Sequence, residues 1–276
     1  MTSRHSTSVG VRLNARKGIT MSEVAVEQEL WMRRFHPAAN DSPRIVVLPH
    51  AGGSANFFVP LSRALSPRLD VQAVQYPGRQ DRLAEKGIED MAEFADRIFA
   101  AIRPQSDRPL ALYGHSMGAV VAFEVAHRLE ASGAAPLGVV VSGRRAPSSH
   151  RDEKRHVSDD EIVAELRALS GTQAGLLADE EFLRMILPAM RSDYRAVESY
   201  TCSPDAVLSC PVLALTGDAD PRTTLDEVKA WAAHTTGPFE LEVFSGGHFF
   251  ITDHQSRIAD LVADFVSRAA GAARSR

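Results

Sequence analysis

Short apolar runs alternate with segments of helical periodicity along most of the chain. The apolar runs predict buried strands at 44–48, 71–76, 110–113, 137–143, 211–216 and 239–244. Helical periodicity follows several of these runs, at 88–103, 119–133, 225–236 and 255–270. Strands that alternate with helices in this way predict an α/β fold, with a mostly parallel central sheet and helices on both of its faces.

The alternation breaks between about residue 146 and residue 205, where the apolar spacing is helical and no good strand occurs. Three helices are predicted there, over about 158–170, 179–190 and 192–200. We interpret this stretch as an inserted helical lid over the C-terminal edge of the sheet, where open α/β sheets bind ligands. Met185 and Leu187 are the lid side chains expected to line an apolar pocket. Plain helical packing without contact to a substrate is the alternative.

Length and composition favour one large domain. The chain has 276 residues, of which 44% are hydrophobic, and we expect a single α/β domain over 26–276. Residues 1–25 are polar and carry four basic side chains before the first acid, Glu23, so a flexible tail is predicted. The net charge of −4 gives no basic excess for nucleic acid.

The sequence also bears on the compartment. It contains no run of ~18 apolar residues for a membrane span, and no apolar signal-peptide core near its start. A cytoplasmic protein is therefore expected. The two cysteines, Cys202 and Cys210, form no disulfide framework and lack zinc-ligand spacing, so two reduced thiols are expected.

One stretch carries the most specific chemistry, namely Gly114-His115-Ser116-Met117-Gly118. Gly-x-Ser-x-Gly between a predicted strand and a predicted helix is typical of a nucleophile elbow, which lifts the serine hydroxyl to the top of a sheet. Gly114 and Gly118 supply the space that the tight turn needs, and glycine tolerates backbone angles that other residues resist. The N–H of Met117, at the start of the helix, is predicted to face a developing oxyanion.

A second loop is expected to complete the oxyanion hole. Pro49-His50-Ala51-Gly52-Gly53-Ser54 directly follows the first strand, ahead of the serine in the chain. A glycine-rich loop at this place supplies the second oxyanion donor in folds with a nucleophile elbow. Ala51 is the predicted donor and Gly52 the next candidate, while an ordinary strand-to-helix turn is the alternative.

The order Ser116, Asp220, His248 matches a Ser-Asp-His triad, and each residue follows a predicted strand. Ser116 is the predicted nucleophile, His248 the base, and Asp220 the acid that holds the imidazole. Asp218 lies in the same loop and is the alternative acid. His50 and His115 lie in the oxyanion loop and in the elbow, where packing within the loop is a better interpretation than the role of catalytic base. No zinc-hydrolase spacing and no Gly-x-Gly-x-x-Gly after a strand occur, so neither a metal nor a cofactor is predicted.

With these residues in place, the chain resembles the type II (external, editing) thioesterases of polyketide and non-ribosomal peptide assembly lines, within the α/β-hydrolase superfamily. Five segments carry the resemblance, at 48–54, 76–79, 114–118, 192–196 and 246–250. It implies an α/β-hydrolase fold and hydrolysis of acyl groups from the phosphopantetheine arm of an acyl or peptidyl carrier protein. It also implies a free-standing protein. Small acyl thioesters are further expected substrates, charge and hydropathy lead us to expect no nucleic-acid or membrane partner, and a monomer is expected.

Other functions remain open at this stage. A generic carboxylesterase or lipase would use the same triad, and a cyclising thioesterase would release a ring instead of a free acid. A non-catalytic binding module on this fold would not react with a serine-directed probe. For a carrier partner, the best docking candidate is the segment 144–155, with five basic and two acidic side chains, although a solvated loop is the simpler interpretation.

Overall fold

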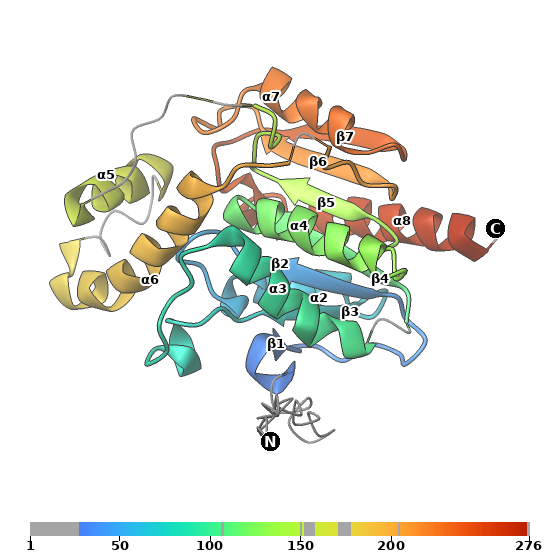
Figure 1. The fold of residues 1–276 in the computed structure, drawn as a ribbon, viewed down its shortest axis with the longest axis horizontal. Helices are drawn as coiled ribbons and strands as arrows, with labels where there is room; N and C mark the ends of the chain where they lie inside the picture. Colours follow the sequence, from blue (N-terminus) through green and yellow to red (C-terminus); the bar gives the residue numbers. More distant parts are fainter. Residues whose placement is uncertain are drawn as a thin grey trace, which may run out of the picture.

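The computed structural model describes residues 28–105, 108–149, 151, 158–170, 178–203 and 205–274. The predicted tail, 1–25, lies outside these ranges. A seven-stranded sheet forms the centre of the described part (Figure 1). Its strands are β1 (Met32–Arg33), β2 (Arg44–Leu48), β3 (Asp70–Val74), β4 (Leu110–His115), β5 (Val139–Ser142), β6 (Val212–Gly217) and β7 (Phe239–Phe244).

The strand order is β1-β3-β2-β4-β5-β6-β7, and only the edge strand β1 is antiparallel to its neighbour. The six predicted strands occur within two residues of their expected ends. They were recognisable because parallel strands covered on both faces read as continuous apolar runs. The two-residue β1 was not predicted, since so short an edge strand leaves no pattern of its own.

Helices cover both faces of the sheet, as the sequence predicts (Figure 1). One face carries α3 (Met91–Ile102) and α4 (Met117–Ala131), and its core includes Phe94, Phe123 and Trp231. The opposite face carries α2 (Val59–Leu65) and α8 (Gln255–Arg274), and its core includes Phe58, Phe250 and Phe265. The sequence analysis missed α2, whose seven residues contain a proline near the start.

The segment predicted as 225–236 forms two short pieces. The α-helix α7 (Leu225–Lys229) begins with a capping box between Thr224 and Glu227, and a 3₁₀ turn continues it over Ala230–His234. Within the described ranges, no helix is long and apolar enough to cross a membrane.

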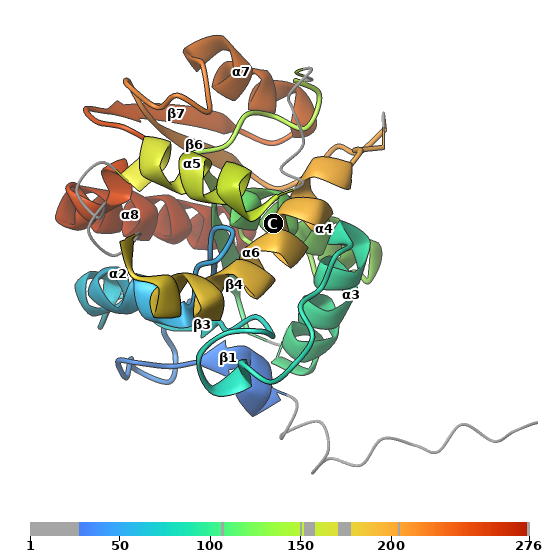
Figure 2. The ribbon, with the colours of Figure 1, turned by 90° about the vertical axis from the view of Figure 1, so that its left-hand side faces the viewer.

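The inserted lid consists of α5 (Asp159–Ser170) and α6 (Glu180–Ser199) in the described part of the chain. Figure 2 looks onto the edge of the sheet that these two helices cover. The prediction of two helices, over 179–190 and 192–200, was wrong, because α6 continues through residue 191 without a break, with Pro188 in its interior. One proline removes a single backbone hydrogen bond, and the continuous buried face of α6 outweighs that loss.

Candidate active site

The turn between β4 and α4 consists of Ser116 alone. Its φ of 56° and ψ of −117° lie where residues other than glycine are rarely found. Such a conformation costs about 1–3 kcal/mol and persists only where the surrounding structure enforces it. Here the Ser116 N–H donates to the Ser142 carbonyl at 2.7 Å, which ties the turn to β5. The strand–turn–helix context predicted from the sequence is therefore present.

The two glycines of the elbow are required by close packing. A Cβ on Gly114 would overlap the carbonyl oxygen of Gly118, and a Cβ on Gly118 would overlap the carbonyl oxygen of Leu48. Neither glycine has a positive φ. The left-handed angle that the sequence analysis associated with glycine is adopted by Ser116 itself.

The loops after β6 and β7 bring an acid and a histidine together. His248 Nδ1 lies 2.9 Å from Asp220 Oδ2, and both side chains are almost completely buried. The other carboxylate oxygen, Oδ1, accepts a hydrogen bond from the Arg222 N–H at 2.8 Å. This arrangement favours a proton on Nδ1 of the neutral ring and leaves Nε2 as the nitrogen that can accept one.

The alternative acid, Asp218, has a different place. It is exposed, and its Oδ1 accepts a hydrogen bond at 2.9 Å from the N–H of Gly246, two residues before His248. Asp218 therefore supports the loop that carries the histidine. The structure brings Asp220, and not Asp218, to the imidazole.

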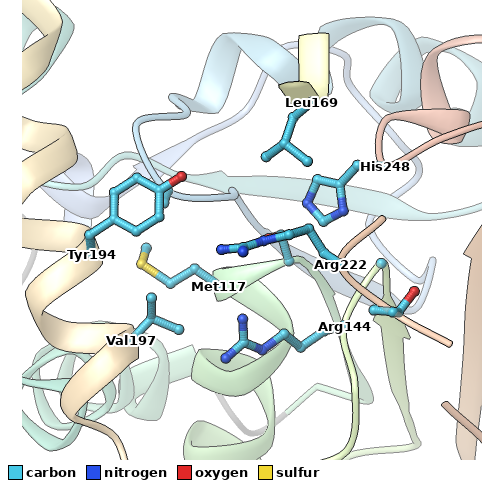
Figure 3. Close-up of a pocket in the computed structure, with 11 residues that line it drawn as sticks. Met117, Arg144, Leu169, Tyr194, Val197, Arg222 and His248 are labelled. Carbon is cyan, nitrogen blue, oxygen red and sulfur yellow. The ribbon is translucent and has the colours of Figure 1, made fainter. Parts of the chain in front are cut away.

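A pocket opens at this edge of the sheet, and Ser116 is among the residues that line it. His248 lines it as well (Figure 3). Met117 and Ala51, the two predicted oxyanion donors, line it as well. Met117 is the first residue of α4, so its N–H has no partner within that helix. All four residues follow parallel strands, which explains why they meet at one edge.

The lid contributes Leu169 of α5 and Tyr194 and Val197 of α6 to this pocket (Figure 3). The prediction that Met185 and Leu187 line it is wrong. Met185 is 48% exposed, and Leu187 packs into the core below the lid. These positions lie on one helix, and periodicity does not tell which part of a helix face meets the pocket.

Two arginines that the sequence analysis did not single out as pocket residues, Arg144 and Arg222, also line the pocket (Figure 3). Arg222 forms an ion pair with Glu165 of α5, with Nε and Oε1 2.9 Å apart. The backbone N–H of Arg222 also donates to Asp220, so Arg222 connects the lid to the loop after β6 that carries this acid.

Two further histidine rings lie beside His248. The His115 ring is 5.3 Å from the His248 ring, and the His50 ring packs edge-on against Phe57 and Phe249. Burial, and then the nearby His248, lower the pKa of His50 to about 3. The same two causes lower the pKa of His115 well below its usual value. Both rings are therefore neutral at neutral pH, so they do not oppose a positive charge on His248.

The buried, neutral His50 predicts a pH-dependent stability. Below about pH 6.5 the unfolded chain protonates this imidazole, whereas the folded protein does not until about pH 3, so stability falls as the pH is lowered between them. When the pH is lowered from about 7.5 to about 5.5, protonation of His50 in the unfolded chain should lower the free energy of unfolding by about 1.4 kcal/mol. Urea unfolding of wild type and His50→Gln at both pH values measures this. Equal losses in the two proteins would show that His50 titrates normally in the fold.

The basic segment 144–155 is described only at 144–149 and at Arg151; His150 and 152–155, including Lys154, lie outside the described residues. Arg151 is ion-paired with Glu227, in the capping box of α7. Burial raises the pKa of the Glu227 carboxyl, but hydrogen bonds from Arg151 and Thr224 outweigh it and lower this pKa to about 2. Arg151 thus connects the segment after β5 to α7.

A mostly parallel sheet covered by helices, with a serine elbow after β4, an acid after β6 and a histidine after β7, defines an α/β-hydrolase. Among the described residues, no group of three or more His, Cys, Asp or Glu is placed to hold a metal ion. The thioesterase domain family matches residues 43–266, and the chain belongs to that family.

Related proteins agree with this assignment. The chain is 50% identical to thioesterase PikA5 of Streptomyces venezuelae over 255 residues, which cover 91% of this chain and 90% of PikA5. It is 52% identical over 246 residues to a probable cadicidin biosynthesis thioesterase of Streptomyces griseus, covering 88% of this chain and 68% of that protein. These matches make the protein an enzyme that hydrolyses thioesters.

A solved structure supports the fold. The type II thioesterase BorB, from the borrelidin biosynthetic cluster, superposes with a TM-score of 0.81 at 49% identity. The match covers 86% of this chain and 98% of BorB. The α/β-hydrolase fold and the resemblance to type II thioesterases, both expected from the sequence, are thereby confirmed.

Proposed function

We propose that this thioesterase removes acyl groups from the phosphopantetheine arm of acyl or peptidyl carrier proteins in a polyketide or non-ribosomal peptide pathway. The observation that carries the proposal is one lidded pocket lined by Ser116 and His248, with Asp220 bonded to the far side of the imidazole. A type II thioesterase from the yersiniabactin NRPS/PKS biosynthetic pathway, to which this chain is 31% identical, supports the pathway class. Removal of stalled or wrong acyl groups would let the assembly line resume.

The proposed reaction proceeds through an acyl-enzyme. His248 Nε2 takes the proton of Ser116 as Oγ attacks the thioester carbonyl carbon, and the N–H groups of Met117 and Ala51 stabilise the oxyanion. The tetrahedral intermediate collapses by breaking the C–S bond, and the imidazolium returns its proton to the leaving thiolate. Water, deprotonated by the same histidine, then attacks the carbonyl carbon of the ester on Ser116. The second tetrahedral intermediate breaks its C–Oγ bond, the imidazolium returns the proton to Oγ, and the free acid leaves. Asp220 holds the ring and stabilises its charged form.

The acyl chain is proposed to lie under the lid, against Leu169, Tyr194 and Val197. Val197→Phe fills part of this space and should shift the kcat/KM ratio of long to short acyl thioesters at least about tenfold toward the short chain. Rates on a chain-length series of acyl-N-acetylcysteamine thioesters measure the ratio. Met185→Phe, on the exposed side of the same helix, is the matched control and should leave the profile unchanged. If both variants keep the wild-type profile, the acyl group does not lie against α6.

The proposed substrate class is tested by comparing kcat/KM on acyl-carrier proteins, on the matching acyl-CoA thioesters and on p-nitrophenyl esters. A carrier-directed thioesterase should favour the carrier-bound thioester, because the protein partner adds contacts that the small substrates lack. Higher rates on the nitrophenyl esters would indicate a general carboxylesterase. A ring product instead of a free acid would indicate a cyclising enzyme.

A further inference from the structure

The proposed oxyanion loop, residues 49–54, and the residue that follows it, Ala55, are held from two sides. From the sheet side, the hydroxyl of Tyr76 donates to the Pro49 carbonyl at 3.2 Å, and Gln75 Oε1 accepts from the Ala55 N–H at 3.0 Å. From the lid side, the Gly52 N–H donates to Asp193 Oδ2 of α6 at 2.7 Å. The lid helix therefore makes the shortest of these three contacts, and the only one to a charged group.

Asp193 is fully buried and forms an ion pair with Arg79, which is itself buried. Burial raises the pKa of the Asp193 carboxyl, and the contacts from Arg79 and the Gly52 N–H oppose that rise. Both contacts converge on Oδ2. A buried carboxylate is tolerated only where such contacts compensate its lost hydration, so the position of the loop N–H and the charge of Asp193 depend on each other.

The backbone at Gly52 transmits its contact with Asp193 to the neighbouring residue, Ala51. Gly52 has a φ of 73°, and Met190 of α6 occupies the place where a Cβ would lie. Because a peptide unit is planar, fixing the Gly52 N–H fixes the plane of the whole unit between Ala51 and Gly52. The backbone of Ala51, whose N–H is the proposed oxyanion donor, is thus held at its C-terminal side by α6.

We infer that Asp193 is a positioning residue that couples the seating of lid helix α6 to the geometry of the oxyanion hole. This inference rests on the proposed role of Ala51 in the thioesterase reaction. The helix that lines the pocket through Tyr194 and Val197 also holds the donor that stabilises the transition state. The oxyanion hole is complete only when α6 lies against the loop, so the lid controls the rate of the reaction as well as access to the pocket.

The test compares two double variants that both lack the buried charges. Arg79→Met with Asp193→Asn keeps an amide oxygen that can accept from the Gly52 N–H, whereas Arg79→Met with Asp193→Ala does not. Removing both charges avoids the unpaired buried ion that a single substitution would leave. The two proteins differ only in the amide group of residue 193, so the ratio of their rates measures what that group contributes through its contact to the loop.

On a small acyl thioester, the alanine double variant should have a kcat about 10–100-fold below that of the asparagine double variant, with KM the same within about threefold. A boronic acid that forms a tetrahedral adduct with the serine should bind more weakly by a similar factor. Arg195→Ala is the control on the same helix, because it breaks an exposed ion pair to Glu89 and should change neither value. Thermal unfolding midpoints verify that each variant is folded.

Equal kcat and equal boronate affinity in the two folded double variants would overturn the inference, as would a change in KM alone. The proposed function is judged separately, by turnover of the wild-type protein on carrier-bound thioesters. If the boronate affinities differ as expected but the wild type hydrolyses no thioester, the coupling holds and the proposed function fails.

Discussion

Ser116→Ala is expected to lower kcat on an acyl thioester by about 10⁴-fold or more, while the protein remains folded. The hydroxyl is the proposed attacking group, and the remaining oxyanion donors support only a small rate above that in water. The methyl side chain of alanine is no larger than that of serine, so we expect residue 116 to keep the same strained backbone angles. Steady-state rates measure the loss of kcat, and a thermal unfolding midpoint shows whether the variant is folded.

Ser132→Ala, at the opposite end of α4, is the matched control for removing one hydroxyl from this part of the fold. It should leave turnover within about twofold of wild type, because Ser132 Oγ only bonds a carbonyl of the preceding turn. A rate for Ser116→Ala close to that of Ser132→Ala would show that another residue is the nucleophile.

Asp220→Asn is expected to lower kcat by about 10³–10⁴-fold, the second largest effect. An amide at this position no longer stabilises the charged imidazole, and its NH₂ group favours the tautomer with the proton on Nε2 of His248. That tautomer cannot accept the serine proton. The variant should keep a KM near that of wild type, since Asp220 is not among the described residues that line the pocket.

Asp218→Asn is the control within the same loop. Its oxygen still accepts from the Gly246 N–H, so turnover should fall only a few-fold. Measuring kcat for both variants on one substrate decides between the two acids. The opposite ranking would assign the acid role to Asp218 and would remove the basis for placing Asp220 in the triad.

The parts of the fold predicted from sequence are those with a local signal. Buried parallel strands give continuous apolar runs, and the tight turn at Ser116 needs small neighbours that are visible as Gly114 and Gly118. The meeting of Asp220 and His248 could be predicted because each follows a strand of one parallel sheet. Their catalytic roles stay predictions that the substitutions above test.

The parts that could not be predicted depend on tertiary packing. Periodicity finds the lid helices, yet it does not tell which of their side chains face the pocket, and so Leu169 and Val197 were missed in favour of Met185. The predicted break at residue 191 is absent, because the buried side chains of α6 continue on both sides of it, at Met190 and Ser192. The contact between Asp193 and Gly52 joins residues 141 positions apart, and no local sequence pattern predicts it.

The proposal that this enzyme clears carrier proteins is tested most directly by intact-protein mass spectrometry. An acylated carrier protein is incubated with wild type or with Ser116→Ala, and the masses of the carrier and the free acid are followed. The account predicts that wild type returns the carrier to its free-thiol form and releases the acid, whereas the variant leaves the carrier acylated. A carrier that stays acylated with wild-type enzyme, under conditions where a p-nitrophenyl ester is hydrolysed, would contradict it.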